Sequence, residues 1–270
     1  MTRSYQWSLS PLALFTVMIS FLSATPALSG AYLENRETGL LMIDVRIDHA
    51  RASFSATGQL TSSVIFDRVD TTSNLEWGLN DRVTVLLSTG ATKATYEDET
   101  GYNYYSGRSV TEVGARFKLI RGADWILSAQ TTELVPINTS YINSAVATDT
   151  LEQQDLRLLL GKNFVIGTRY PLYAEIQIGE RFRQSTSTEN HIDTSLAWRP
   201  LANVMFLAQT FWTHAPASGL SPDLSQTKAE LSIIYDISRS LAFQIGGFDT
   251  VSARNALSEH GVIAGLWIHF

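Results

Sequence analysis

The chain has 270 residues, of which 44% are hydrophobic and 17% charged, and its mean hydropathy is +0.01. This hydropathy is high for a soluble protein and too low for a bundle of membrane helices. A formal net charge of −6 argues against a general nucleic-acid-binding protein, and the absence of cysteine excludes disulfides, thiolate metal sites and thiol nucleophiles. A soluble β-rich domain and a membrane β-barrel are the classes that remain.

Residues 1–29 have the composition of a secretory leader. Arg3 is their only charged residue, and an apolar stretch of about 12 residues is followed by small residues. The apolar stretch is too short to cross a bilayer as a helix, which takes roughly 20 residues. We therefore predict a signal peptide over 1–29, cleaved before Gly30, and a single outer-membrane barrel domain over 30–270. Cleavage after Ala27 is the close alternative, and a buried N-terminal helix is the less favoured interpretation.

From about Leu40 onward, apolar and polar residues alternate with the period of two that half-buried strands show. The clearest alternating segments are 41–48, 112–119, 174–179, 228–235 and 262–270. Short polar turns are predicted at 78–82, 121–124, 161–163, 199–203 and 236–240. Longer polar stretches lie between them, at 50–67, 92–108, 137–150, 184–190, 214–226 and 249–259.

Short and long connections alternate along the chain, which predicts an even number of strands with short turns at one end and long loops at the other. That arrangement is typical of outer-membrane barrels. We predict an all-β fold, a twelve-stranded antiparallel transmembrane β-barrel of the outer-membrane type. Both termini would lie at the short-turn end, in the periplasm. The competing interpretation is a secreted β-sandwich, which also alternates but usually has seven to nine strands.

Aromatic residues gather near the predicted short turns, where their rings would suit the headgroup layer. We predict a membrane girdle formed by Trp77, Trp125, Tyr173, Trp198 and Tyr235. A second girdle near the long loops would consist of Phe54, Phe66, Phe182, Trp212 and Phe248. The chain ends on an alternating segment whose last residue is Phe270. This ending resembles the signal that the barrel assembly machinery recognises, so Phe270 is predicted to be an assembly signal.

Several segments resemble small bacterial outer-membrane proteins of the XagA-like group, linked to exopolysaccharide and biofilm loci, and more loosely the meta-pathway phenol-degradation proteins. The resembling pieces are Gly30-Ala31-Tyr32-Leu33 with Gly39, LEWGLNDRVTV at 75–85, LLLGKNF at 158–164, AEIQIGERFR at 174–183 and DTSLAWRP at 193–200. Where such proteins often carry Trp after the opening Gly-Ala, this chain has Tyr32. The resemblance implies an outer-membrane barrel and supplies no catalytic residues.

If the apolar face of each strand meets lipid, the polar face lines the lumen. The predicted lumen residues are Asp44, Arg46, Asp48, Glu112, Arg116, Lys118, Arg157, Glu175, Arg181, Arg183, Asp193, Lys228 and Glu230, with Asp70, Glu76 and Arg199 as further candidates. Acids and bases are balanced in this set. Balanced charge indicates either a weakly selective pore or ion pairs that brace a largely filled barrel.

Enzymatic function is not predicted. His191, Asp193 and Ser195 occupy alternate positions, but residues two apart on a strand are about 7 Å from each other, too far for direct hydrogen bonding. No cofactor or metal site is predicted. The stretch 92–108 combines clustered carboxylates with tyrosines, which could bind sugars or Ca²⁺, but a solvated loop is the preferred interpretation.

The leading functional hypothesis is a channel or transport protein of the cell outer membrane that passes small or linear polar solutes. The family resemblance adds an association with exopolysaccharide secretion. The alternative is a closed-lumen surface protein acting in adhesion, biofilm or envelope organisation through its long loops. The expected partners are outer-membrane lipid and lipopolysaccharide, the barrel assembly machinery, and exopolysaccharide or its secretion components, with no nucleic acid.

Overall fold

The computed structural model describes residues 30–98, 101–134, 153–166, 170–183, 187–218 and 222–270. Most of these residues lie in twelve strands, as the period-two alternation predicts. The strands are β1 (Gly39–Phe54), β2 (Leu60–Asn80), β3 (Val83–Asp98), β4 (Gly101–Arg121), β5 (Trp125–Leu134), β6 (Gln153–Ile166), β7 (Tyr170–Arg183), β8 (Glu189–Leu201), β9 (Val204–Ala215), β10 (Leu224–Asp236), β11 (Leu241–Arg254) and β12 (Ala256–His269).

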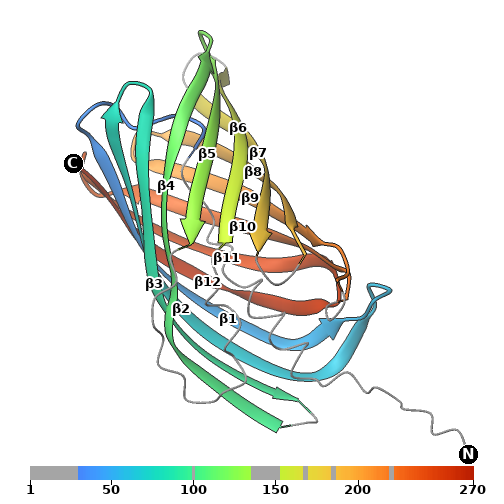
Figure 1. The fold of residues 1–270 in the computed structure, drawn as a ribbon. Helices are drawn as coiled ribbons and strands as arrows, with labels where there is room; N and C mark the ends of the chain where they lie inside the picture. The colour runs from blue at the N-terminus through green and yellow to red at the C-terminus, as the bar shows by residue number, and fades with distance from the viewer. Residues whose placement is uncertain (1–29, 99–100, 135–152, 167–169, 184–186, 219–221) are drawn as a thin grey trace, which may run out of the picture.

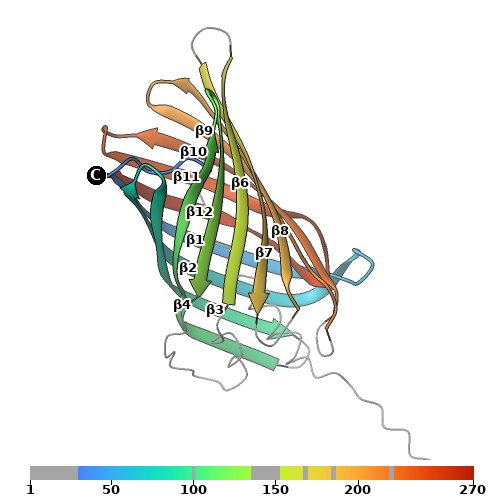
Figure 2. The same ribbon diagram turned by 45° about the horizontal axis from the view of Figure 1, so that its top comes forward.

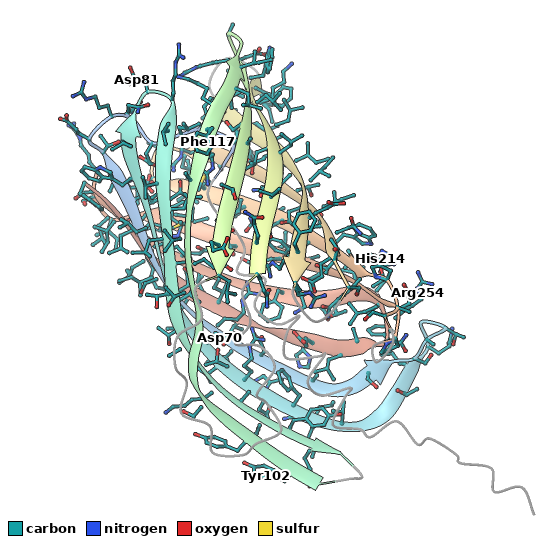
Figure 3. All side chains as sticks on the ribbon, viewed as in Figure 1. Asp70, Asp81, Tyr102, Phe117, His214 and Arg254 are labelled. Carbon is teal, nitrogen blue, oxygen red and sulfur yellow. The ribbon has the colours of Figure 1, made fainter. Side chains whose placement is uncertain are left out.

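Each strand runs antiparallel to its neighbours, and β1 pairs with β12, so the sheet closes into a barrel (Figure 1 and Figure 2). The predicted twelve-stranded antiparallel barrel is confirmed. Gly39 and Phe270 lie at the same end of the barrel, which we call the terminal end. The opposite end is the distal end. In Figure 3, Asp81 marks the terminal end and Tyr102 lies on the β3–β4 hairpin at the distal end.

The described residues contain no helix that is both long enough and apolar enough to cross a membrane. The predicted signal peptide and the predicted loop 137–150 lie outside the described residues.

The strands are longer than the sequence pattern predicted. A bilayer is crossed by about 9–11 residues of a tilted strand, whereas β2 and β4 each have 21 residues. Three predicted loops, 50–67, 92–108 and 249–259, are therefore mostly strand, and β3–β4 projects far at the distal end (Figure 1). Outside the lipid, both faces of a hairpin can be polar, so its sequence resembles that of a loop.

One predicted short turn is misplaced. Residues 161–163 lie within β6, where Gly161 is the cross-strand partner of Glu175 and Lys162 that of Ala174. Strand β6 continues to Ile166. Gly161 faces inward against Tyr173, where a side chain would not fit, because a Cβ there would lie 2.7 Å from the Tyr173 hydroxyl. Together with Lys162 and Asn163, this glycine makes a polar triplet that resembles the sequence of a turn. The other four predicted turns coincide with connections at the terminal end.

The outer face carries a belt of exposed apolar side chains, contributed by eleven of the strands. They are Val45, Ile47, Val69, Val85, Leu87, Val113, Phe117, Leu156, Leu158, Leu160, Ile176, Ile178, Ile192, Leu196, Phe206, Leu231, Ile233, Phe243, Ile245, Val262 and Leu266. In water such a surface would be strongly unfavourable, whereas in lipid it matches its surroundings. A closed sheet also leaves no unpaired strand edge in the lipid. The chain is thus an outer-membrane barrel.

Four of the predicted girdle residues lie on the outer face near the terminal end: Trp77, Trp125, Trp198 and Tyr235. The Trp198 ring stacks on Phe206, with centroids 5.8 Å apart.

The girdle assignment of Tyr173 is wrong. Its hydroxyl donates a hydrogen bond to Glu175 inside the barrel. Residues i and i+2 of a strand share a face, so a lumen-facing Glu175 requires a lumen-facing Tyr173. The second girdle is also partly wrong, because Phe66 and Phe248 are buried inside the barrel and Phe54 packs against the buried Leu224 cluster. Nearness to a predicted turn or loop therefore does not determine which face of the strand a ring occupies.

The last residue closes the barrel. The backbone N–H of Gly39 donates to the carbonyl of Phe270 at 2.8 Å, and the Phe270 N–H donates back at 3.0 Å. The Phe270 ring stacks on Trp77 with centroids 5.6 Å apart. Both rings lie over Gly39, where a Cβ would come within 2.7 Å of Phe270 and 2.9 Å of Trp77. Glycine at position 39 thus allows two aromatic rings to cover the β1–β12 seam.

We predict that Phe270→Ala lowers the amount of folded barrel in the outer membrane several-fold while leaving export across the inner membrane intact. The substitution removes the predicted assembly signal and the ring that covers the seam. The folded fraction is measured by the mobility shift on SDS gels between unheated and heated samples. Tyr235→Ala, which removes another exposed aromatic ring at the same end but away from the seam, is the control and should fold normally. Equal folded yields for the two variants would contradict the prediction.

Candidate functional site: the barrel interior

The inward face of the barrel is polar and densely paired. Of the predicted lumen residues, Asp44, Asp48, Arg116, Arg157, Glu175, Arg181, Asp193 and Glu230 are buried. The side chains of Arg46, Arg183 and Lys228 are 12%, 4% and 14% exposed. Glu112 and Lys118 are partly exposed, and their cross-strand partners Leu134 and Ser128 face inward. The structure therefore places every predicted lumen residue on the inward face.

One ion-pair network extends across β6, β7 and β8. Arg157 is at its centre, donating to Asp155 at 2.7 and 3.1 Å and to Asp193 at 2.6 Å. Arg181 donates to the same Asp155 carboxylate at 3.2 Å. Glu112 of β4 is close enough to interact electrostatically with Arg181. This network joins β6, β7 and β8 through their inward side chains.

The opposite wall is crossed by a longer bridge. Arg46 of β1 reaches past β12 and β11 and donates to Glu230 of β10 at 2.8 Å. Its guanidinium also lies 4.6 Å from the centroid of the Phe248 ring. Asp44 is buried beside Arg46. Additional inward ion pairs join neighbouring strands: Asp48–Arg68, Arg68–Asp70, Arg183–Glu189 and Lys228–Glu259.

Inward-facing acids outnumber inward-facing bases among the described side chains, which corrects the balanced set expected from the sequence. The acids on the strands are Asp44, Asp48, Asp70, Glu76, Glu112, Asp155, Glu175, Glu189, Asp193, Glu230 and Glu259. The bases are Arg46, Arg68, Arg116, Lys118, Arg157, Arg181, Arg183 and Lys228. Arg199 lies at the terminal rim and pairs with Asp236. Among the described side chains, the inward face therefore carries more acidic than basic groups.

Several inward charged residues are absent from the predicted lumen set, because the sequence pattern assigns their segments to loops or to no element. Glu189 and Glu259 lie inside stretches predicted as loops, and Arg68 directly follows another. Asp155 is two residues from Arg157, so strand alternation could have found it. Buried glutamines were also overlooked: Gln130, Gln153, Gln177, Gln209, Gln226 and Gln244. Amides that can donate and accept hydrogen bonds thus line the interior between the charged groups.

A strap of residues 30–38, which precede β1, follows the inner wall at the terminal end. Going backward along the chain, the Glu34 N–H donates to Thr84 of β3 at 3.0 Å, and Arg116 of β4 donates to the Tyr32 carbonyl at 3.3 Å. Ser128 of β5 donates to the Ala31 carbonyl at 2.7 Å, and the Ala31 N–H donates to Glu175 of β7. The strap thus passes five consecutive strands to reach the side of the barrel opposite β1.

Packing reinforces the strap. Ala31 is fully buried with Ile126 and Leu159, and Tyr32 and Leu33 pack against this cluster. The Tyr32 ring meets the Tyr173 ring edge-on at 5.7 Å. Partial burial raises the pKa of the Tyr32 phenol, which therefore stays neutral, donates to the Asp124 carbonyl and accepts from Asn163.

Arg116 connects the strap to the wall. It is fully buried, donates twice to Gln130 at 3.0 Å and binds Glu76 of β2 at 3.1 and 3.4 Å. The same guanidinium donates to the strap at Tyr32. The sequence pattern places Arg116 on the inward face but carries no signal of this backbone contact.

The three residues considered for catalysis have separate partners. His191 contacts Glu189 at 3.4 Å, Asp193 accepts from Arg157, and Ser195 accepts from Gln209 at 3.1 Å. Although all three face inward on β8, they form no proton relay with one another.

No protein-family model matches the chain, and no curated protein matches it in sequence. Solved structures do match. An outer membrane channel from Pseudomonas putida F1 has a TM-score of 0.69 at 12% identity, covering 90% of this chain and 98% of that one. The translocator domain of the autotransporter NalP from Neisseria meningitidis scores 0.54 at 10% identity, covering 88% and 90%. The porin NanC scores 0.53 at 10% identity, covering 84% and 98%. These likenesses show the fold.

We predict that Arg157→Ala destabilises the barrel by about 3–5 kcal/mol, because removing one partner leaves buried carboxylates uncompensated. Arg51→Ala is the control. Arg51 pairs with Asp67 on an exposed site, where ion pairs contribute at most about 1 kcal/mol. Urea unfolding in lipid vesicles gives both free energies of unfolding. A loss for Arg157→Ala no larger than that of the control would contradict the buried network.

Proposed function

We propose that the protein is an outer-membrane channel for small or linear polar solutes, with a preference for cations and neutral molecules over anions. The single observation that carries this proposal is the inward face itself, which combines amides with an excess of carboxylates. Rings of one charge sign select ions of the opposite sign. The channel and porin among the structures of the same fold are consistent with the proposal.

Hydrogen-bonding amides suit hydrated, uncharged solutes as well as cations. Gln130, Gln177 and Gln244 each exchange hydrogen bonds with neighbouring inward side chains. Sugars present the same kind of donors and acceptors, so a solute could replace such bonds at small cost. An association with exopolysaccharide secretion is supported by the XagA-like resemblance and by this polar lining, and it remains part of the proposal.

A closed-lumen surface protein is the second candidate. It is favoured by the ion-pair networks and the strap, which together occupy much of the inward face. In that case the hairpins at the distal end would perform the function, and the inward charges would serve stability alone.

Single-channel recording in planar bilayers distinguishes the two candidates. We expect small conductance steps and a reversal potential in a salt gradient that indicates cation preference. Replacing both Arg116 and Arg181 by Ala should raise the conductance and increase the cation preference, because both long inward cations are lost. Absence of steps from the wild type and from the double variant would leave the closed-lumen protein as the better account.

Charge selectivity should respond to inward acids and not to outward ones. We predict that Glu112→Gln reduces the cation preference, since Glu112 is an inward acid that is partly exposed. Glu133→Gln is the control, because Glu133 lies on the adjoining strand and is exposed on the outer face. The measurement is the shift in reversal potential of each variant. Equal shifts for the two substitutions would contradict selection by the interior.

A further inference from the structure

The strap ends beside a buried carboxylate. Glu175 is buried, and its oxygens accept hydrogen bonds from the Tyr173 hydroxyl, the Ala31 N–H and the Gln177 amide, the last at 2.6 Å. All three donors are neutral. Among the described residues, Glu175 has no ion-pair partner, whereas the inward carboxylates of Glu76, Asp155 and Glu230 each contact an arginine. Arg116 acts on the Glu175 carboxylate only at longer range, and a buried carboxylate with no cation in contact is costly.

Gly30 lies directly beside this carboxylate. A Cβ on Gly30 would be 2.7 Å from the Tyr173 hydroxyl and 3.1 Å from the Glu175 Oε2 atom. The Gly30 nitrogen is attached to the same Cα as that Cβ position, so in a chain that begins at Gly30, rotation about the Cα–C bond can bring the amino group to the same two groups. As an amide this nitrogen offers a single neutral donor, whereas as a free amino terminus it would offer a positive charge and three donors.

We propose that Gly30 is the first residue of the mature chain and that its α-ammonium group forms the missing ion pair with Glu175, with Tyr173 completing the binding site. Hydrolysis of the Ser29–Gly30 bond by the leader peptidase of the export pathway creates this group. The C–N bond breaks, the oxygen of water goes to the new Ser29 carboxylate, and both protons of water end on the Gly30 nitrogen, which becomes the ammonium group. Removal of the leader then latches the strap to β7. This proposal is independent of whether the lumen conducts.

Two other features of the strap are consistent with an ion pair between Gly30 and Glu175. Glycine is required at its first position, because a side chain would collide with Tyr173. Arg116 holds the middle of the strap and β1 holds its end, so an ion pair at Gly30 fixes the remaining free end. A chain cleaved after Ala27 would instead begin two residues earlier, and its ammonium group would be separated from Glu175 by Leu28 and Ser29.

The first test is the intact mass of the protein purified from outer membranes. The mass should correspond to residues 30–270. A mass that corresponds to a chain beginning at Leu28 would overturn the proposal, since no α-ammonium would then be present on Gly30.

The second test is the reactivity of the amino terminus towards a succinimidyl ester near neutral pH, followed by peptide mass mapping. In the folded barrel, Gly30 should acylate at least tenfold more slowly than in the heat-unfolded chain, and Glu175→Gln should raise the folded rate several-fold. Glu112→Gln, which changes an inward carboxylate away from the strap, should leave the rate unchanged. Equal rates in Glu175→Gln and the wild type would overturn the ion pair.

A third variant keeps the test decisive if Glu175→Gln fails to fold. Tyr173→Phe retains the carboxylate and removes the hydroxyl that binds both Glu175 and the Ala31 N–H. Its amino terminus should react faster than that of the wild type and slower than that of the unfolded chain. Equal acylation rates of the amino terminus in the folded and the unfolded wild-type protein would also refute the ion pair between Gly30 and Glu175.

Discussion

The pairing of β1 with β12 is the constraint on which the rest of the structure depends. Lipid offers no hydrogen bonds to the backbone, so a sheet can cross a membrane only when its two edges join. Here the first and last strands pair from Leu40 with His269 onward, and Gly39 and Phe270 complete the seam with two backbone hydrogen bonds. Closure also fixes the direction of every side chain, because each strand then has one face to lipid and one to the interior.

The closed sheet determines the chemistry of the interior. Twelve strands enclose a limited space, and long charged side chains point into it from all sides. Arg157 and Arg46 therefore meet carboxylates from neighbouring strands, and Arg116 meets both the wall and the strap. Burying such charges costs solvation, which their mutual attraction repays only with good geometry and further hydrogen bonds, and removing one partner leaves a buried charge uncompensated. We expect the same charges to set the sign of the field inside the barrel.

The sequence allowed the strand number, the closure and the face of most residues to be predicted, because period-two alternation is a local property. It could not fix where strands end. Polar hairpins beyond the lipid resemble loops, so Glu189 and Glu259 were placed in loops although both are buried inside. Tyr173 was assigned by its level along the barrel, although its strand position next to Glu175 already required an inward ring. The strap had no local signal, since its contacts with Thr84, Ser128 and Glu175 join residues 50 to 144 positions apart.

The register of the closing seam is tested most directly by disulfide cross-linking, which is straightforward because the chain has no cysteine. Val45 on β1 lies opposite Ala264 on β12. Opposite residues of antiparallel strands have Cα atoms about 4.5–5.5 Å apart, within the range that a disulfide spans. A Val45→Cys, Ala264→Cys variant should cross-link efficiently in the outer membrane, whereas Val45→Cys with Ile268→Cys should not. Cross-linking of the second pair, or of neither, would contradict the closed barrel described here.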